Sequence, residues 1–290
     1  MAQQARTFRV FVSSTFKDMM VERNVLQELV FPRLRLICEA YGTRFQVVDL
    51  RWGVSVQAQR DQQTMPLCID EIKRCRDISP RPHFIFLLGE RYGWVPLPST
   101  ITASEFERLT AVMKADRNLV EQWYSRDNNA IPPIYRLRPR SVDGSLPGDP
   151  DWAEAEALEA AQWTKTETKL HAALRKAASE AGLTGHALTK YSMAATEQEI
   201  EAALFGPEAP DDASEHIFGF IRRSNIRDDS AIVSLKNRLH QKLPAEHLVM
   251  YDPIENDAKR QTEFVEAVFE AVVETFCQAI NGCRRAFEVV

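Results

Sequence analysis

Short apolar runs alternate with longer amphipathic stretches along most of this chain. The apolar runs predict five strands, at residues 8–12, 44–50, 84–88, 216–221 and 248–251. Apolar residues at helical spacing predict helices at residues 19–41, from 66 onward, 196–205, 230–243 and 262–280. Strands that alternate with helices in this way favour parallel pairing. The pattern therefore predicts an α/β fold with a five-stranded, parallel, doubly wound sheet of the flavodoxin-like type.

Residues from about 99 to 190 interrupt this alternation, because they contain helical patterns and proline-rich or turn-rich segments but no strand pattern. We interpret them as a helical insertion before the third crossover helix. With 290 residues, of which 44% are hydrophobic, the chain could form one large domain or two small ones. Because the insertion lacks strands and the sheet pattern returns after it, we expect a single domain over residues 1–290 that carries the insertion.

The first predicted strand ends in a polar turn that leads into a helix. In an open parallel sheet, ligands bind at the carboxyl ends of the strands, so this turn is a candidate binding loop. Its residues are Ser13, Ser14, Thr15 and Phe16. Hydroxyl and amide groups at a helix start suit a phosphate, but serine and threonine are also preferred N-caps, and both interpretations stay open. Arg23, one turn into the helix, is predicted to form a salt bridge to a neighbouring loop.

Cationic and aromatic residues follow the second and third strands. They are Arg51 and Trp52 in one loop and Arg91 and Tyr92 in the other. Such side chains can hold a pyrophosphate and stack on a nicotinamide or adenine ring. They can equally pack on each other as cation–π pairs or contact another protein. If the first and third strands are neighbours, we expect the loops that follow them to face each other across one cleft.

The composition and residue spacing argue against several kinds of function and site. A formal net charge of -5 and a pI near 5.8 argue against nucleic-acid binding through bulk electrostatics. No segment reaches the roughly 18 apolar residues that a membrane span needs, so we expect no membrane partner and a cytoplasmic location. The five cysteines are irregularly spaced and favour reduced thiols over a disulfide framework. No metal site is predicted, because the six histidines show no H-E-x-x-H spacing.

Five short motifs occur in order over nearly the whole chain. They are VFVSSTFKDMMVERNVL (10–26), VVDLRWGVS (47–55), FIFLLGERYGWVPLP (84–98), TEQEI (196–200) and FGFIRR (218–223). Together they resemble the TIR-like domain at the N-terminus of NACHT or STAND signalling ATPases. That group includes telomerase-associated and nephrocystin-like proteins and bacterial defence homologues. The resemblance implies a TIR-like fold, a homo-oligomer formed through TIR-like contacts and a downstream NACHT or STAND ATPase as partner.

The resemblance also implies an activity. TIR enzymes cleave the nicotinamide–ribose bond of NAD with a glutamate in a W-C-x-x-E pattern on the helix after the third strand. This chain lacks the Trp-Cys pair, and aligning its TEQEI run makes Glu199 the counterpart and Glu197 the substitute candidate. The implied function is an NAD nucleosidase in immune or antiphage-type signalling. NAD is then the substrate, and no cofactor is expected.

The same residues allow a purely structural interpretation. Thr196 and Glu199 fit the S/T-x-x-E capping box, and Glu197 in the first turn suits the helix dipole. Against this, one carboxylate near an anomeric carbon can stabilise the cation that forms when an N-glycosidic bond breaks. Two functions therefore stay open at this point: an NAD-hydrolysing effector, and a non-catalytic protein–protein interaction module.

Overall fold

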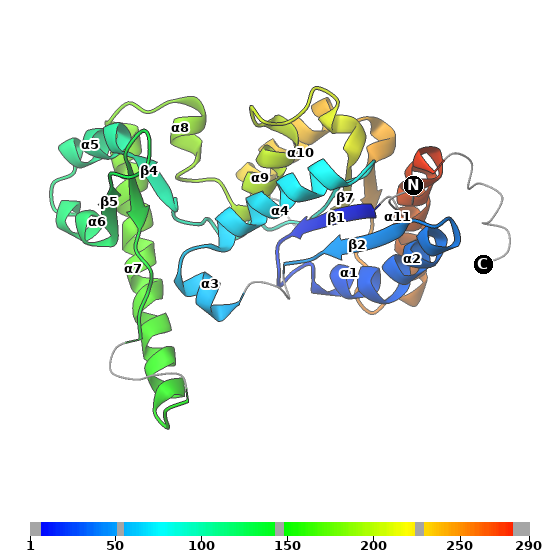
Figure 1. The fold of residues 1–290 in the computed structure, drawn as a ribbon, viewed down its shortest axis with the longest axis horizontal. Coiled ribbons are helices and arrows are strands. Elements are labelled where there is room, and N and C mark those ends of the chain that lie inside the picture. The colour runs from blue at the N-terminus through cyan, green and yellow to red at the C-terminus, as the bar shows by residue number, and fades with distance from the viewer. Residues whose placement is uncertain (1–6, 51–54, 143–147, 224–228, 281–290) are drawn as a thin grey trace, which may run out of the picture. The chain divides into compact units, whose positions relative to one another are not determined.

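The five predicted strands pair into one parallel sheet in the computed structural model of the chain, which describes residues 7–50, 55–142, 148–223 and 229–280 (Figure 1). The strands are β1 (Thr7–Ser14), β2 (Arg44–Val48), β3 (Phe84–Leu88), β7 (Ile217–Arg222) and β8 (Leu248–Tyr251). Their order is β2-β1-β3-β7-β8, with every neighbour parallel. This is the flavodoxin-like order, and it places the topological switch point between β1 and β3. The predicted fold class is confirmed.

Helices cover both faces of this sheet. One face packs against α1 (Met20–Val25), α2 (Phe31–Ala40) and α11 (Ala258–Ala279), and the other packs against α4 (Thr64–Ile78), α9 (Ala195–Ile200) and α10 (Ser230–Lys242). Side chains alternate between the faces, as the pleat of a strand requires. In β3, for example, Ile85 and Leu87 belong to the first core, whereas Phe84, Phe86 and Leu88 belong to the second.

Short connecting elements complete this part of the chain. They are the π-helical turns η1 (Leu26–Val30) and η2 (Glu201–Phe205) and the 3-10 turns η3 (Ala213–His216) and η4 (Ala245–His247). The single predicted helix at 19–41 is thus divided, with η1 between α1 and α2 and Pro32 in the first turn of α2. It ends at Gly42, whose φ of 67° is the left-handed value expected after a helix C-cap.

The chain folds as two units. The first comprises Met1–Gly53, Cys68–Trp94 and Thr196–Val290, and contains the parallel sheet. The second comprises Val54–Leu67 and Val95–Ala195, and so includes residues 99–190, the predicted insertion. The prediction of a single domain over residues 1–290 stays a prediction.

The second unit has its own core and a small sheet. Its helices are α3 (Val56–Arg60), α5 (Ala103–Val112), α6 (Arg117–Trp123), α7 (Trp152–Glu180) and α8 (Gly185–Thr189). Its strands β4 (Thr100–Thr102), β5 (Tyr124–Asp127) and β6 (Ile134–Leu137) form an antiparallel sheet in the order β4-β6-β5. The prediction that this region lacks strands is wrong. Strands of three or four residues are too short to display a clear two-residue alternation.

The described residues include four of the five cysteines. Cys38, Cys68 and Cys75 are free and buried, but Cys277 is disulfide-bonded, so the prediction of reduced thiols is wrong at that position. Cys283 lies outside the described residues. Among the helices described, none is long and apolar enough to cross a membrane.

Candidate functional site

Glu199 reaches the carboxyl end of β1. Glu199 is only 8% exposed, and its carboxylate accepts a hydrogen bond from the hydroxyl of Ser13, which lies 186 residues earlier in the sequence. Cys68, in α4, lies beside the same carboxylate. Glu199 therefore contacts the switch-point edge of the sheet, whereas a capping box would turn it toward the start of its own helix. The π-helical turn η2 begins two residues later, and such turns occur frequently at functional sites.

The surroundings of Glu199 disfavour its charged form. Burial raises the pKa of this carboxyl group, and the negative charge of Asp49 adds to the effect. Ser13, Cys68 and Arg23 act in the opposite direction without cancelling it. Burial also raises the pKa of the Cys68 thiol, and Glu199 raises it further. The thiol is therefore protonated near neutral pH, and it is a neighbour of the carboxylate that cannot act as a thiolate nucleophile.

Arg23 is a buried cation at this edge. Its side chain is 2% exposed, its Nη2 donates to the carbonyl oxygen of Val12 at 2.7 Å, and it pairs with Asp49 at 3.3 Å. Asp49 directly follows β2, so the predicted salt bridge from Arg23 to a neighbouring loop is confirmed. The Phe16 ring lies 5.5 Å from the Arg23 guanidinium carbon and is 55% exposed.

Glu197 has a different set of partners. It accepts a hydrogen bond from the Tyr92 hydroxyl and pairs with Arg238 Nη1 at 2.9 Å. Arg238 also pairs with Glu201. Burial raises the pKa of Glu197, although Tyr92 and Arg238 both act to lower it. Two residues on a helix differ by about 200° in direction, so Glu197 and Glu199 point to different surroundings. Of the two carboxylates, Glu199 is the one that contacts β1.

The loops after β1 and β3 touch each other. Ser13 pairs with Phe86 and Ser14 with Leu87 in the parallel register, so both strands end at the same edge. A Cβ atom on Gly93 would lie 2.8 Å from Thr15 Cγ2, and the φ of Gly93 is +95°, so only glycine fits this close approach. The prediction that these two loops face each other is confirmed.

The other predicted binding residues differ in their exposure and in their hydrogen-bond partners. Ser14 donates to the carbonyl oxygen of Thr15 at 2.7 Å, whereas the buried Thr15 hydroxyl has no hydrogen-bond partner among the described residues. Arg91 is exposed beside the half-buried Tyr92. Arg51 and Trp52 lie outside the described residues, so their binding role stays a prediction. Within the described residues, no group of three or more histidine, cysteine or acidic side chains is placed to hold a metal ion.

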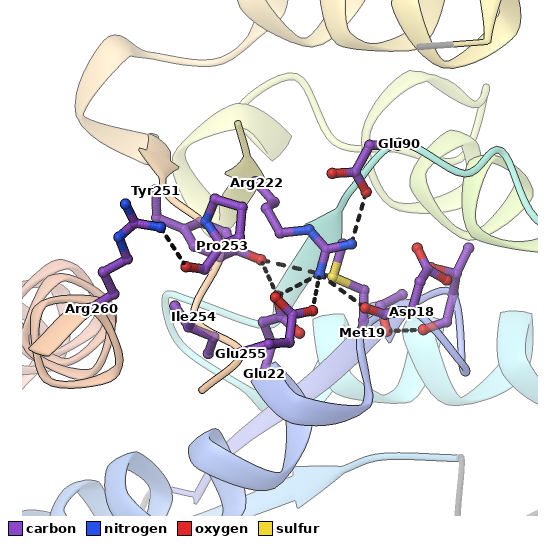
Figure 2. A network of polar contacts seen from close by, with 12 residues as sticks. Asp18, Met19, Glu22, Glu90, Arg222, Tyr251, Pro253, Ile254, Glu255 and Arg260 are labelled. Carbon is purple, nitrogen blue, oxygen red and sulfur yellow. Dashed lines mark hydrogen bonds and ion pairs between the residues drawn. The ribbon is translucent and has the colours of Figure 1, made fainter. Parts of the chain in front are cut away.

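A second buried charge cluster at this edge was not predicted from the sequence. Arg222, at the end of β7, is 5% exposed and donates from Nη1 to the Asp18 carbonyl oxygen at 3.0 Å, to Glu22 at 2.9 Å and to Glu255 at 3.0 Å. Its Nη2 donates to Glu90 at 2.8 Å (Figure 2). One feature of the sequence could have indicated this cluster. A charged residue directly follows the apolar residues of β7, at the edge of the sheet where ligands bind.

Known proteins resemble part of this chain. Residues 9–132 match the sequence profile of DUF4062, which is described as a domain of unknown function. The human NACHT and WD repeat domain-containing protein 2 is 41% identical over 140 residues, which are 47% of this chain and 8% of that protein. The human NACHT domain- and WD repeat-containing protein 1 is 33% identical over 183 residues, 61% of this chain and 11% of that protein.

A third relative is more distant. The mouse telomerase protein component 1 is 33% identical over 91 residues, 31% of this chain and 3% of that protein. The chain thus spans about a tenth or less of the length of these relatives, and no solved structure matches it. The DUF4062 match includes β1, β3 and both touching loops but ends before Glu199. The chain is thus similar to DUF4062 domains over residues 9–132 and similar in sequence to NACHT-containing proteins.

Proposed function

We propose that this chain is a TIR-like effector that hydrolyses NAD at the nicotinamide–ribose bond. The observation that supports the proposal most directly is the contact of Glu199 with Ser13 at the carboxyl end of β1. Ligands bind at this position in flavodoxin-like sheets. The TIR resemblance, which selects the same glutamate, supports the proposal independently.

The proposed chemistry needs one ionisable carboxyl group. When the bond between C1′ and the nicotinamide nitrogen breaks, its electron pair leaves with the ring, and nicotinamide departs neutral without needing an acid. The ribose then carries positive charge at C1′, which ionised Glu199 stabilises. Water adds to C1′, and Glu199 accepts the proton that this water loses. Its raised pKa makes Glu199 a better proton acceptor than an exposed glutamate.

Access to Glu199 requires a movement. Because its residue is 8% exposed, NAD reaches the carboxylate only when a neighbouring segment shifts. In this proposal the side chains of Arg91 and Tyr92, in the loop after β3, move when chains associate, and self-association thereby switches the activity on. The loop from Ser13 to Phe16 and residues Arg51 and Trp52 complete the proposed contacts with the dinucleotide.

The proposed setting is immune or antiphage-type signalling. NACHT domains and WD repeats are named in the human proteins that this chain resembles. We propose that a NACHT ATPase accompanies the domain and brings copies of it together. NAD is the substrate, and the reaction as written uses no further cofactor.

The test is release of nicotinamide by clustered protein. The chain is fused to a tetrameric tag and incubated with NAD, and nicotinamide and ADP-ribose are separated and quantified. We expect Glu199→Gln to reduce the rate at least about 100-fold, in line with removal of one group that stabilises transition-state charge. Glu197→Gln, a matched loss of charge two residues away, should retain activity within about tenfold, because that carboxylate serves an ion pair.

Two results would count against this proposal. Absence of release from clustered wild-type protein would contradict the activity itself. Loss of release in Glu197→Gln with activity retained in Glu199→Gln would move the chemistry to Glu197.

One observation favours the second candidate function, a non-catalytic interaction module. Both glutamates already have protein partners, and Glu199 is buried. In that case self-association persists without nicotinamide release. Sedimentation equilibrium of wild type and Glu199→Gln, combined with the release assay, separates the two candidates.

A further inference from the structure

We infer that Arg222 is a positioning residue that fixes the two candidate binding loops relative to each other. The loops are residues 15–19, after β1, and residues 89–93, after β3. The functional meaning of the inference rests on the proposed NAD-binding role of these loops. The physical coupling between them is independent of any activity.

Arg222 contacts the loops that follow β1, β3 and β8 at this edge. Nη1 donates to the Asp18 carbonyl oxygen and to Glu22, which fixes the end of the first loop and the start of α1. Nη2 donates to Glu90, which fixes the second loop. Glu255, after β8, completes the set (Figure 2).

Each loop is also held at a second point. Ser13, just before the first loop, donates to Glu199, and Tyr92, inside the second loop, donates to Glu197. Between these anchors the loops meet at Thr15 and Gly93. Arg222 therefore contacts both loops at once.

The geometry requires a guanidinium group. One planar fork serves four oxygen atoms from three loops and one helix, at distances of 2.8–3.0 Å. A lysine ammonium has the same charge but is a single point with three donors, and it cannot reproduce the fork. Replacement by a neutral residue would leave buried Glu22 without its cation and put folding at risk. Arg222→Lys is therefore the informative variant.

Close packing supports the same conclusion. A Cβ atom on Gly89 would lie 3.0 Å from Arg222 Nη2 and 2.5 Å from Met19 Cε. The guanidinium thus lies directly over the end of β3, with no room for another side chain there. Tyr251 donates to Glu22 at 3.2 Å and holds the acceptor of Nη1 in place.

The test uses hydrogen–deuterium exchange of the whole chain. We expect Arg222→Lys to speed amide exchange at least about fivefold in both residues 15–19 and residues 89–93, because local opening follows the loss of local contacts. Exchange in β3 and α11 should stay within about twofold of wild type. The matched control is Arg223→Lys, since Arg223 is adjacent but 57% exposed, with an exposed ion pair to Asp252. It should change neither loop.

A second variant keeps the inference testable if Arg222→Lys does not fold. Glu90→Gln weakens one arm by removing its charge and leaves the other three acceptors unchanged, so faster exchange should be confined to residues 89–93. Unchanged loops in Arg222→Lys, a change in one loop only, or an equal increase through β3 and α11 would each overturn the inference. If Arg222→Lys does not fold, unchanged exchange at 89–93 in Glu90→Gln overturns it.

Steady-state kinetics supply the functional readout. If the chain hydrolyses NAD, Arg222→Lys should raise KM about tenfold and change kcat less than about threefold, because the loops bind substrate whereas Glu199 is held by Ser13. An equal loss in kcat with unchanged KM would contradict the positioning role. If wild type releases no nicotinamide, the proposed function fails, and the exchange experiment alone decides the inference.

Discussion

The two ends of the parallel sheet treat buried titratable groups in opposite ways. At the carboxyl end, Arg23 and Arg222 are buried cations, each paired with acidic side chains. At the amino end, His83 is 1% exposed, and neither ring nitrogen has a hydrogen-bond partner within the part of the chain that the structure describes. Burial lowers the pKa of His83 to about 3, so this ring is neutral in the folded protein near neutral pH. The carboxyl end therefore holds buried charges, whereas His83 at the amino end is buried without one.

The buried charges at the carboxyl end suggest a function, whereas the neutral His83 serves packing. Burying a charge is unfavourable unless partners compensate for the lost hydration, and apolar replacements of buried pairs are often as stable. A sheet edge that retains several buried charges therefore suggests a use other than stability, which agrees with the proposed function. His83 behaves as a core side chain that happens to be titratable.

The largest expected effect on stability is at the charged end. Arg23→Ala should lower the free energy of unfolding by about 3–5 kcal/mol, because Asp49 would be left buried without this cation. Urea unfolding at pH 7 measures the change. A loss below about 1 kcal/mol would mean that the charged edge is effectively solvated, and the contrast between the two ends would disappear.

The next effect is at the neutral end and depends on pH. His83 has a folded-state pKa of about 3 and an unfolded-state value of about 6.5, so the unfolded chain binds the proton first. Its contribution is fully present above pH 6.5 and is lost as the pH falls toward 3. At pH 4.5 the loss is about 2–3 kcal/mol.

His83→Leu provides the measurement for this end. The unfolding free energy of wild type should fall by about 2–3 kcal/mol relative to that of the variant as the pH falls from 7 to 4.5, because only wild type loses stability through this group. Parallel curves across that range would show that His83 does not exclude charge in the folded protein.

The smallest expected effect lies at the exposed rim of the charged end. Arg223 and Asp252 are both at least half exposed and 3.2 Å apart. Arg223→Ala should change the unfolding free energy by less than about 1 kcal/mol. A larger loss, measured by the same urea unfolding, would show that exposure does not separate the two arginines at the end of β7.

Local patterns in the sequence were sufficient to predict the sheet. Apolar runs such as Phe84–Leu88 marked the strands, and parallel topology then brought the loops after β1 and β3 together. The strands of the second unit were missed because segments such as Thr100–Thr102 carry too few residues to show alternation. Their pairing depends on contacts with β6, which is more than thirty residues away.

The candidate site was predictable only where a local motif existed. Glu199 and the Ser13 loop were identified separately, and the sequence left the capping interpretation of Glu199 open. The Arg222 cluster joins side chains separated by 33 to 200 residues, so no local spacing reveals it. The same holds for Cys68, whose helix approaches Glu199 only in the folded chain.

The most direct test of the account compares stability and catalysis in one variant, Glu199→Gln. We expect its unfolding free energy to equal or exceed that of wild type, because a buried carboxyl group that resists ionisation is replaced by a neutral amide. We expect nicotinamide release from the clustered variant to fall at least about 100-fold. A variant that is destabilised by more than about 2 kcal/mol and releases nicotinamide at the wild-type rate would make Glu199 a structural residue, and it would contradict the central claim.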